Sequence, residues 1–264
     1  MTMPERTEAT APRDRSPVLE VRGGVKRFGP VTALDHVNLH LYEGEVLALL
    51  GDNGAGKSTM IKALSGVHAL DGGQLLLDGA AVTLRSPTET RAAGIETVYQ
   101  DLALFDNLNI SSNFFAGREE CTPTWLGPLA FTNDKKMERQ TRRLIDELEV
   151  NLPDPRAHVG LMSGGQRQAI AVARAVAFAR RIILDEPTAA LGARESRNVL
   201  RLIKRLPELG LSVILISHNL EQVMQVADRA MVLRRGEYIG EREPTPQNHE
   251  ALVGMIVGGG ARLD

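Results

Sequence analysis

The fold and a ligand site are both indicated by one stretch of sequence, Gly51-Asp52-Asn53-Gly54-Ala55-Gly56-Lys57-Ser58. These residues directly follow the apolar run Val46–Leu50, which has the composition of a strand buried on both faces of a parallel sheet. After them, Met60, Ile61 and Leu64 share one face of a predicted helix. The glycine-rich stretch therefore lies between a strand and a helix, where backbone N–H groups can turn toward a phosphate.

The same stretch matches a phosphate-binding loop, with glycine at its first and sixth positions followed by lysine and serine. This pattern predicts that Lys57 reaches the β- and γ-phosphates of ATP and that Ser58 ligates Mg²⁺. The alternative is a glycine-rich turn without a ligand, which the strand-to-helix setting disfavours. The predicted ATP-binding set is Gly51, Asp52, Asn53, Gly54, Ala55, Gly56, Lys57, Ser58 and Thr59.

The bulk composition excludes several classes of protein. With 264 residues, 43% of them hydrophobic, the chain can bury a substantial core. The 31 basic and 33 acidic residues disfavour a general nucleic-acid binder. The apolar runs are far shorter than the roughly 20 residues that cross a bilayer. A single cysteine, Cys121, allows no intramolecular disulfide, and a reducing, cytoplasmic setting is expected. Residues 1–17 lack an apolar segment and are expected to form a disordered tail.

Strand and helix patterns alternate along the chain and predict an α/β fold with a mostly parallel sheet. Strand patterns cover residues 18–21, 46–50, 75–79, 94–99, 181–184 and 212–216, and helical patterns cover residues 165–179 and about 195–206. Between about residues 101 and 163 the pattern is helical, which predicts an inserted helical subdomain. In its charged part, residues 134–149, one helical face carries Met137, Leu144, Ile145 and Leu148.

Two carboxylates, Asp185 and Glu186, follow the predicted strand 181–184. Ligands of open α/β sheets collect at the carboxyl ends of the strands. Asp185 is therefore predicted to hold Mg²⁺ through water, and Glu186 to act as the general base on the attacking water. Simple capping of a loop is the alternative role for both residues.

The segment Ser163-Gly164-Gly165-Gln166, called here the signature segment, opens the next helix. Ser163 and Gln166 have the spacing of a capping box. Capping does not explain two successive glycines, each of which weakens a helix by about 0.5–1 kcal/mol relative to alanine. Bare backbone lets an anion approach a helix N-terminus closely. A second phosphate site on one small ATPase indicates that another chain supplies its nucleotide.

The phosphate loop, Gln100, the signature segment, the Asp185-Glu186 pair and His218, in this order, resemble the ATP-binding cassette (ABC) family over about residues 18–240. The resemblance implies a P-loop NTPase core with an antiparallel β subdomain and an α-helical subdomain, followed by a C-terminal extension at residues 241–264. It also implies that two cassettes pack head to tail, each signature segment capping the other chain's ATP.

The resemblance also implies roles for three single residues. Gln100 would ligate Mg²⁺, His218 would contact the γ-phosphate, and Phe28 would stack on adenine. Each has a structural alternative, because a lone histidine after a strand is often a satisfied polar group and an aromatic residue near a strand is usually core.

Departures from the family pattern and two further stretches of resemblance point to a subfamily. The loop Ala189-Ala-Leu-Gly192 lacks the terminal aspartate usual in the family, and Met162 replaces the usual leucine before the signature segment. The stretches 101–108 and 186–196 resemble ATPase subunits of bacterial monosaccharide importers. This implies as partners a second ABC ATPase subunit (the same chain or a paralogue), an integral membrane permease and, indirectly, a periplasmic or extracellular sugar-binding protein. The expected location is peripheral, on the cytoplasmic face of the cell membrane.

Alternatives exist both to permease docking and to sugar import. Leu102, Leu104, Phe105, Leu108 and Phe114 form either a permease-docking surface or part of the subdomain core. A soluble ABC ATPase of translation or DNA repair is the alternative class, disfavoured because the chain shows neither a second cassette nor a long coiled-coil insertion. A small-molecule kinase would have no use for the signature segment.

Overall fold

The structure of the chain is a computed structural model that describes residues 16–122 and 131–258. Most of the expected N-terminal tail and the last residues of the expected C-terminal extension lie outside the described residues. Within the described part, the strands form a six-stranded sheet, a four-stranded sheet and a short two-stranded pair.

The six-stranded sheet is built from short apolar runs. All five residues of β3 and all five of β10 are buried, because both faces of these strands are covered. The strand order is β12-β11-β3-β10-β9-β6, and only β12 runs antiparallel to its neighbour. The predicted mostly parallel sheet is confirmed. Its strands are β3 (Val46–Leu50), β6 (Ile95–Val98), β9 (Arg181–Asp185), β10 (Ser212–Ile216), β11 (Arg229–Arg234) and β12 (Glu237–Arg242).

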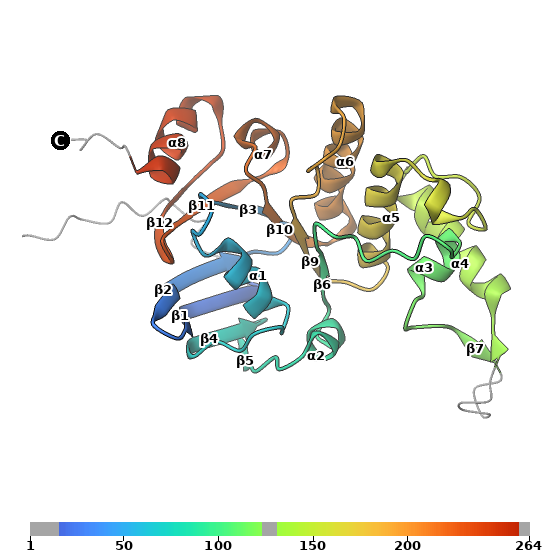
Figure 1. Ribbon diagram of the computed structural model, residues 1–264, viewed down its shortest axis with the longest axis horizontal. Helices are drawn as coiled ribbons and strands as arrows, with labels where there is room; N and C mark the ends of the chain where they lie inside the picture. Colours follow the sequence, from blue (N-terminus) through green and yellow to red (C-terminus); the bar gives the residue numbers. More distant parts are fainter. Residues whose placement is uncertain (1–15, 123–130, 259–264) are drawn as a thin grey trace, which may run out of the picture.

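A four-stranded antiparallel sheet in the order β2-β1-β4-β5 forms a separate layer, with α1 lying between it and the central sheet in Figure 1. The antiparallel β subdomain implied by the family resemblance is thereby confirmed. Its strands are β1 (Leu19–Phe28), β2 (Val31–Leu41), β4 (Gly72–Leu77) and β5 (Ala80–Val82).

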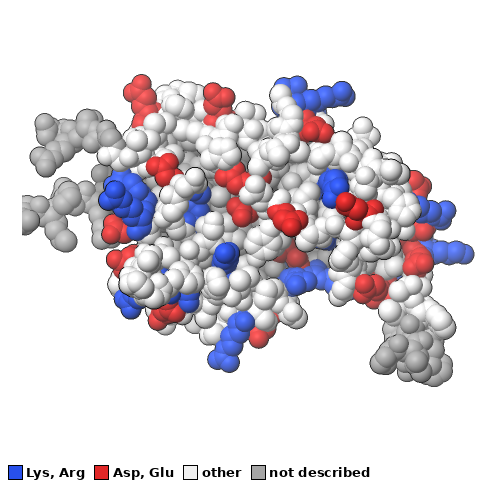
Figure 2. Space-filling view, in the orientation of Figure 1, with Lys and Arg blue, Asp and Glu red and all other residues white. Residues whose placement is uncertain are grey.

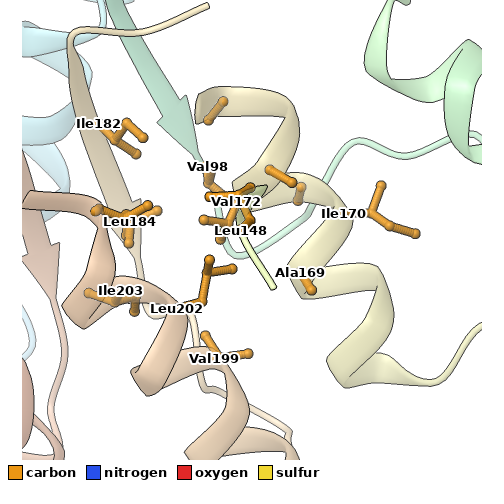
Figure 3. Packing of buried hydrophobic residues seen from close by; sticks show 14 of the residues in the cluster. Val98, Leu148, Ala169, Ile170, Val172, Ile182, Leu184, Val199, Leu202 and Ile203 are labelled. Carbon is orange, nitrogen blue, oxygen red and sulfur yellow. The ribbon is translucent and has the colours of Figure 1, made fainter. Parts of the chain in front are cut away.

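The side-chain alternation of the central strands divides the core into two large clusters. Ile182 and Leu184 of β9 pack with α5 (Gly164–Val176) and α6 (Ala193–Arg205), as Figure 3 shows. Ile183, between them, belongs to the second cluster, which contains α1 (Lys57–Leu64) and the inner face of the antiparallel sheet. Because successive side chains of a strand point to opposite faces, the sheet itself separates the two clusters.

The inserted region between Gln100 and the signature segment lies at the right end of the molecule in Figure 1. Met137, Ile145 and Leu148 are buried and Leu144 packs against the same cluster, so the predicted apolar face of residues 134–149 is confirmed. The region contains α3 (Ile110–Phe114), β7 (Cys121–Thr122), β8 (Phe131–Thr132), α4 (Asp134–Glu147) and the 3-10 helix η2 (Val159–Leu161).

The last described residues pack onto the central sheet. Leu252 of α8 (His249–Val257) is fully buried against β11 and β3 residues, and β12 spans the position where the ATPase domain was expected to end. The other short elements are α2 (Pro87–Ala92), η3 (Leu206–Leu209), α7 (Leu220–Val226) and η4 (Pro246–Asn248).

The surface mixes both signs of charge. Figure 2 shows Lys and Arg side chains interspersed with Asp and Glu over the visible face. Across residues 16–122 and 131–258, the helices are all too short or too polar for a membrane crossing.

Candidate active site

Four adjacent strands of the central sheet end at the same edge. Leu49 of β3 is level with Ile216 of β10, and Ile216 is level with Asp185 of β9. Next to them, Leu184 of β9 is level with Val98 of β6. The segments that leave these strands carry the phosphate loop, His218, Glu186 and Gln100 in that spatial order. The parallel topology therefore brings the predicted residues together where α/β sheets bind ligands.

The glycines of the phosphate loop serve different steric needs. At Gly51 (φ 148°) a Cβ would lie 2.2 Å from the carbonyl oxygen of Leu233, and at Gly56 (φ 105°) it would lie 2.8 Å from that of Ala33. The missing side chain at Gly51 lets the loop leave β3 close to the backbone of β11. The missing side chain at Gly56 lets α1 begin against β2. No side chain caps the N-terminus of α1, so its first amide groups remain available to an anion.

Lys57 lies over the loop from which α1 begins. Its Nζ donates to the carbonyl oxygens of Gly51 (2.5 Å) and Asp52 (3.0 Å). Burial lowers the pKa of the Lys57 ammonium, and the carboxylates of Glu186, Asp52 and Asp185 oppose that shift. Asp185 at the end of β9 and Glu186 directly after it are thus near enough to act on the lysine charge.

Asp185 is the last residue of β9 and is half-buried. Burial raises the pKa of its carboxyl, the neighbouring Glu186 raises it further, and Lys57 lowers it. A buried carboxylate beside another carboxylate is stabilised by added positive charge. The hydroxyl of Ser58, the amide of Gln100 and the carboxylate of Asp185 are oxygen donors of the kind that Mg²⁺ prefers, so the residues present fit that ion.

Glu186 is held in an uncommon backbone conformation with φ 51°. Its N–H donates to the carbonyl oxygen of Ile216 at 3.0 Å, which ties it to the end of β10. Its Oε2 lies 2.8 Å from Nδ1 of His218. The histidine side chain is 75% exposed whereas that of Glu186 is 17% exposed, so a mostly buried carboxylate contacts an imidazole that faces solvent.

Gln100 and Phe28 lie on exposed segments. Gln100 is exposed, shortly after the end of β6. Phe28 ends β1 and is 44% exposed; its ring packs edge-on to His68, with centroids 5.3 Å apart. Phe28 is therefore not part of the core. Because Ala33 of β2 abuts Gly56, the β1–β2 hairpin also adjoins the phosphate loop.

The signature segment forms the capping box that its spacing predicts. Ser163 Oγ accepts from the N–H of Gln166 (3.3 Å), and Gln166 Oε1 accepts from the N–H of Ser163 (3.0 Å). A cavity of about 860 Å³ beside this segment is lined by residues of α5, α6 and the stretch 148–151. Among the described residues that line it, none comes from the phosphate loop or the Asp185-Glu186 pair.

Two parts of the site were not predicted from the sequence. The turn between β11 and β12 supports the phosphate loop, because Gly236 N–H donates to Ala55 O at 3.0 Å. The sequence signal for that turn is Arg235-Gly236 between two strand patterns. The second missed part is Glu195, whose carboxylate meets the signature segment through a contact between helices that leaves no local signal.

Residues 34–189 match the protein-family model described as ABC transporter. The chain belongs to the ABC transporter family. It is 48% identical to the xylose/arabinose import ATP-binding protein of Sulfolobus acidocaldarius, over 91% of this chain and 94% of that protein. It is 47% identical to the fructose import ATP-binding protein of Rhizobium meliloti, over 92% and 95% of the two chains. A ribose import ATP-binding protein of Rubrobacter xylanophilus is 44% identical, and this chain spans 47% of its length.

Solved ABC cassettes have the same fold. A nucleotide-free ATP-binding cassette from an ABC transporter superposes with a TM-score of 0.79 at 22% identity, covering 92% of this chain and 98% of that chain. A cassette in its ADP conformation gives a TM-score of 0.76 at 22% identity, covering 90% of this chain and 99% of that chain. The predicted fold class and family are thus confirmed.

Proposed function

We propose that this chain is the ATP-binding and ATP-hydrolysing subunit of an ABC importer that energises the uptake of a sugar through a separate membrane permease. The observation that carries the proposal is the identity of 47–48%, over nearly the whole length, to two import ATP-binding proteins for monosaccharides. The chain is an ATPase by its family. A soluble ABC ATPase of translation or DNA repair is not favoured, because these relatives are named as import proteins.

The convergence of four strand ends supports the assignment of ATP and Mg²⁺ as ligands. Gly51–Thr59 would surround the phosphates, with Lys57 at the β- and γ-oxygens and Phe28 against the adenine. Ser58, Gln100 and Asp185 would hold Mg²⁺, which neutralises phosphate charge when it is bound with ATP. Glu186 would take the proton of the attacking water, and His218, 2.8 Å away, would orient that carboxylate and contact the γ-phosphate.

The signature segment is proposed to act on ATP bound by a second cassette, either another copy of this chain or a paralogue. The cavity beside Ser163 is lined by α5, α6 and the stretch 148–151, so among the described residues the signature segment and this chain's own phosphate loop do not share that cavity. A solved ABC cassette with the same fold, at a TM-score of 0.69 and 24% identity, is described as a dimer bound to ADP and phosphate. Head-to-tail packing would place Ser163, Gly164, Gly165 and Gln166 on that second nucleotide.

The segment that follows Gln100 is proposed to dock on the permease, at the cytoplasmic face of the membrane. The fully buried Asn113 fixes this segment, since its Oδ1 accepts from Phe105 N–H at 2.8 Å and its Nδ2 donates to Phe105 O at 3.0 Å. Phe105 is 53% exposed, whereas Phe114 is 2% exposed. Phe114 is thus core, and Phe105 is the strongest docking candidate. An external sugar-binding protein would be an indirect partner.

Co-expression with candidate sugar permeases tests the proposal. The chain is expected to co-purify with one permease in detergent, and sugar with its binding protein is expected to stimulate ATP hydrolysis. Phe105→Ala should reduce co-purification, and Phe131→Ala, at a residue that is 75% exposed, serves as the matched control. Transport is contradicted if the chain stays entirely free of every candidate permease, and the ATPase assignment is contradicted if the purified chain does not hydrolyse Mg²⁺-ATP.

A further inference from the structure

One carboxylate joins the start of the signature helix α5 to the start of α6. Glu195 Oε1 accepts from the N–H of Gly165 at 3.3 Å, and its Oε2 accepts from the N–H of Gly192 at 3.4 Å. Hydrogen bonds from the Ser163 side chain and then from the two glycine amides lower the pKa of Glu195. An ionised carboxylate is favoured here, because it faces the N-termini of two helices.

The glycines of the signature segment are packed against the same region. A Cβ at Gly165 would lie 2.8 Å from Cβ and 2.9 Å from Cγ of Glu195, and a Cβ at Gly164 would lie 3.1 Å from Cδ2 of Leu191. Any side chain at Gly165 would displace the stem of Glu195. Gly164 and Gly165 thus allow close packing against Leu191 and Glu195, in addition to letting an anion approach the backbone.

The loop between Glu186 and Glu195 is short and internally bonded. Ala189 N–H donates to Glu186 O at 3.0 Å, Leu191 N–H donates to Thr188 O at 3.3 Å, and Ala190 has φ 62°. A shift of Glu186 would therefore be transmitted along this turn to the N-terminus of α6. At that N-terminus, Glu195 contacts Ser163 and Gly165 and so connects α6 to the signature segment.

We propose that Glu195 is a positioning residue that holds the signature segment in register with the loop following Glu186. The inference rests on the proposed head-to-tail dimer, in which the signature segment serves the partner's ATP while Glu186 serves the chain's own. Glu195 would then couple the two ATP sites of the dimer. It supplies a link within one chain at the loop where Gly192 replaces the aspartate usual in the family.

Glu195→Ala and Glu195→Gln test this role in the full chain. Glutamine keeps one acceptor oxygen at nearly the same position, whereas alanine removes both. Glu208→Gln, at an exposed residue beyond the end of α6, is the matched control. Four quantities are measured: the Kd for Mg²⁺-ATP at concentrations where the chain is monomeric, the turnover rate, its Hill coefficient in ATP, and ATP-dependent dimerisation in the Glu186→Gln background.

We expect Glu195→Ala to leave the monomer Kd within about twofold while lowering turnover and dimer stability by about tenfold or more, the size of a lost charge-assisted hydrogen bond. The Hill coefficient should fall toward one, and Glu195→Gln should restore the larger part of turnover. A general loss of folding would lower the melting temperature and raise the monomer Kd as well. In that case recovered turnover in Glu195→Gln supports the proposal, and a folded Glu195→Gln with turnover equal to that of Glu208→Gln but an unchanged Hill coefficient and unchanged dimerisation in Glu195→Ala overturns it.

Turnover, Hill coefficient and dimerisation of Glu195→Ala equal to those of Glu208→Gln would overturn the proposal and leave Glu195 as a helix cap. Stronger dimerisation of the alanine variant would also overturn it, because the carboxylate would then compete with phosphate. Failure of the proposed function has a different outcome: the unmodified chain would itself neither hydrolyse Mg²⁺-ATP nor dimerise with it.

Discussion

Nδ1 of His218 lies 2.8 Å from Oε2 of Glu186, which links the segments that leave β10 and β9. The contact sets the orientation of a carboxylate that is only 17% exposed. Because two residues that act as a unit give non-additive mutational effects, this pair makes a sharp test of the proposed chemistry.

Glu186→Gln should stop turnover without preventing ATP binding. The amide keeps the shape of the side chain but cannot accept a proton, so hydrolysis should fall by about 100-fold or more while the Kd for Mg²⁺-ATP stays within about twofold. Size-exclusion chromatography with light scattering should detect an ATP-trapped dimer. Glu221→Gln, at an exposed residue of α7, is the control, and rapid hydrolysis by Glu186→Gln would remove Glu186 as the base.

His218→Ala should lower turnover by about 10- to 100-fold, because the Glu186 carboxylate loses the group that orients it. The double variant with Glu186→Gln should be no slower than Glu186→Gln alone. Phosphate release measured for the four members of this cycle checks the expectation. Fully additive losses would mean that the two residues act independently.

Lys57→Ala should lower the affinity for ATP by about 100-fold or more, because it removes the cation held over the phosphate loop. Titration with a fluorescent nucleotide measures the change. Lys62→Ala, at an exposed lysine in the last turn of the same helix, should bind as the parent does. Equal affinity of the Lys57 variant and the parent would refute the assigned role.

Asp185→Asn should stabilise the nucleotide-free chain at neutral pH. Since burial raises the pKa of Asp185 in the folded state, the chain is relatively more stable at low pH and loses that stability as pH rises through the folded-state pKa. Asparagine removes this dependence, so the melting temperature should rise by about 1–3 °C at pH 7 and change little at about pH 4.

Thermal unfolding without Mg²⁺ across this pH range is the measurement, with Asp146→Asn at an exposed residue of α4 as the control. The expected gain in stability should come with weaker binding of Mg²⁺-ATP. A melting temperature that falls at pH 7 would contradict the assignment of Asp185 as a carboxylate kept in place for its ligand.

Arg174→Lys should loosen the proposed docking segment. The Arg174 guanidinium donates to the carbonyl oxygens of Leu102 and Ala103 at 3.0 Å each, and an ammonium cannot reproduce this two-pronged contact. Amide hydrogen exchange of residues 102–105 should increase. Arg201→Lys is the control, since that guanidinium contacts Asn198 on its own helix, and unchanged exchange in the Arg174 variant would show that other contacts fix the segment.

The sequence predicted most accurately the strands in which every residue is buried. The strand expected at residues 46–50 and the strand expected at residues 212–216 have the bounds of β3 and β10, because both are covered on two faces and consist almost entirely of apolar residues. In β2 the buried residues Leu34 and Val37 are three apart, since shifts in its pairing with β1 break the alternation there. The strands predicted from the sequence did not include β2, although Val37, Leu39 and Leu41 alternate with polar residues in its second half.

The active-site edge was predictable for a topological reason. Asp185 ends one apolar strand and His218 follows another, and parallel strands bring such positions to one edge. The contact of Glu195 with Gly165 was not predictable, because it depends on how two helices separated by a strand pack against each other. The supporting turn at Gly236 likewise depends on β11 lying beside β3.

The position of β3 in the sheet has a consequence for how the chain acquires its structure. β3 pairs with β10 on one side and with β11 on the other, and both strands come far later in the sequence. Pairings between distant segments form slowly, because a long loop must close before they contribute. During synthesis the phosphate loop therefore emerges from the ribosome long before its neighbouring strands exist, and a nascent chain has to wait for them before it can hold a nucleotide.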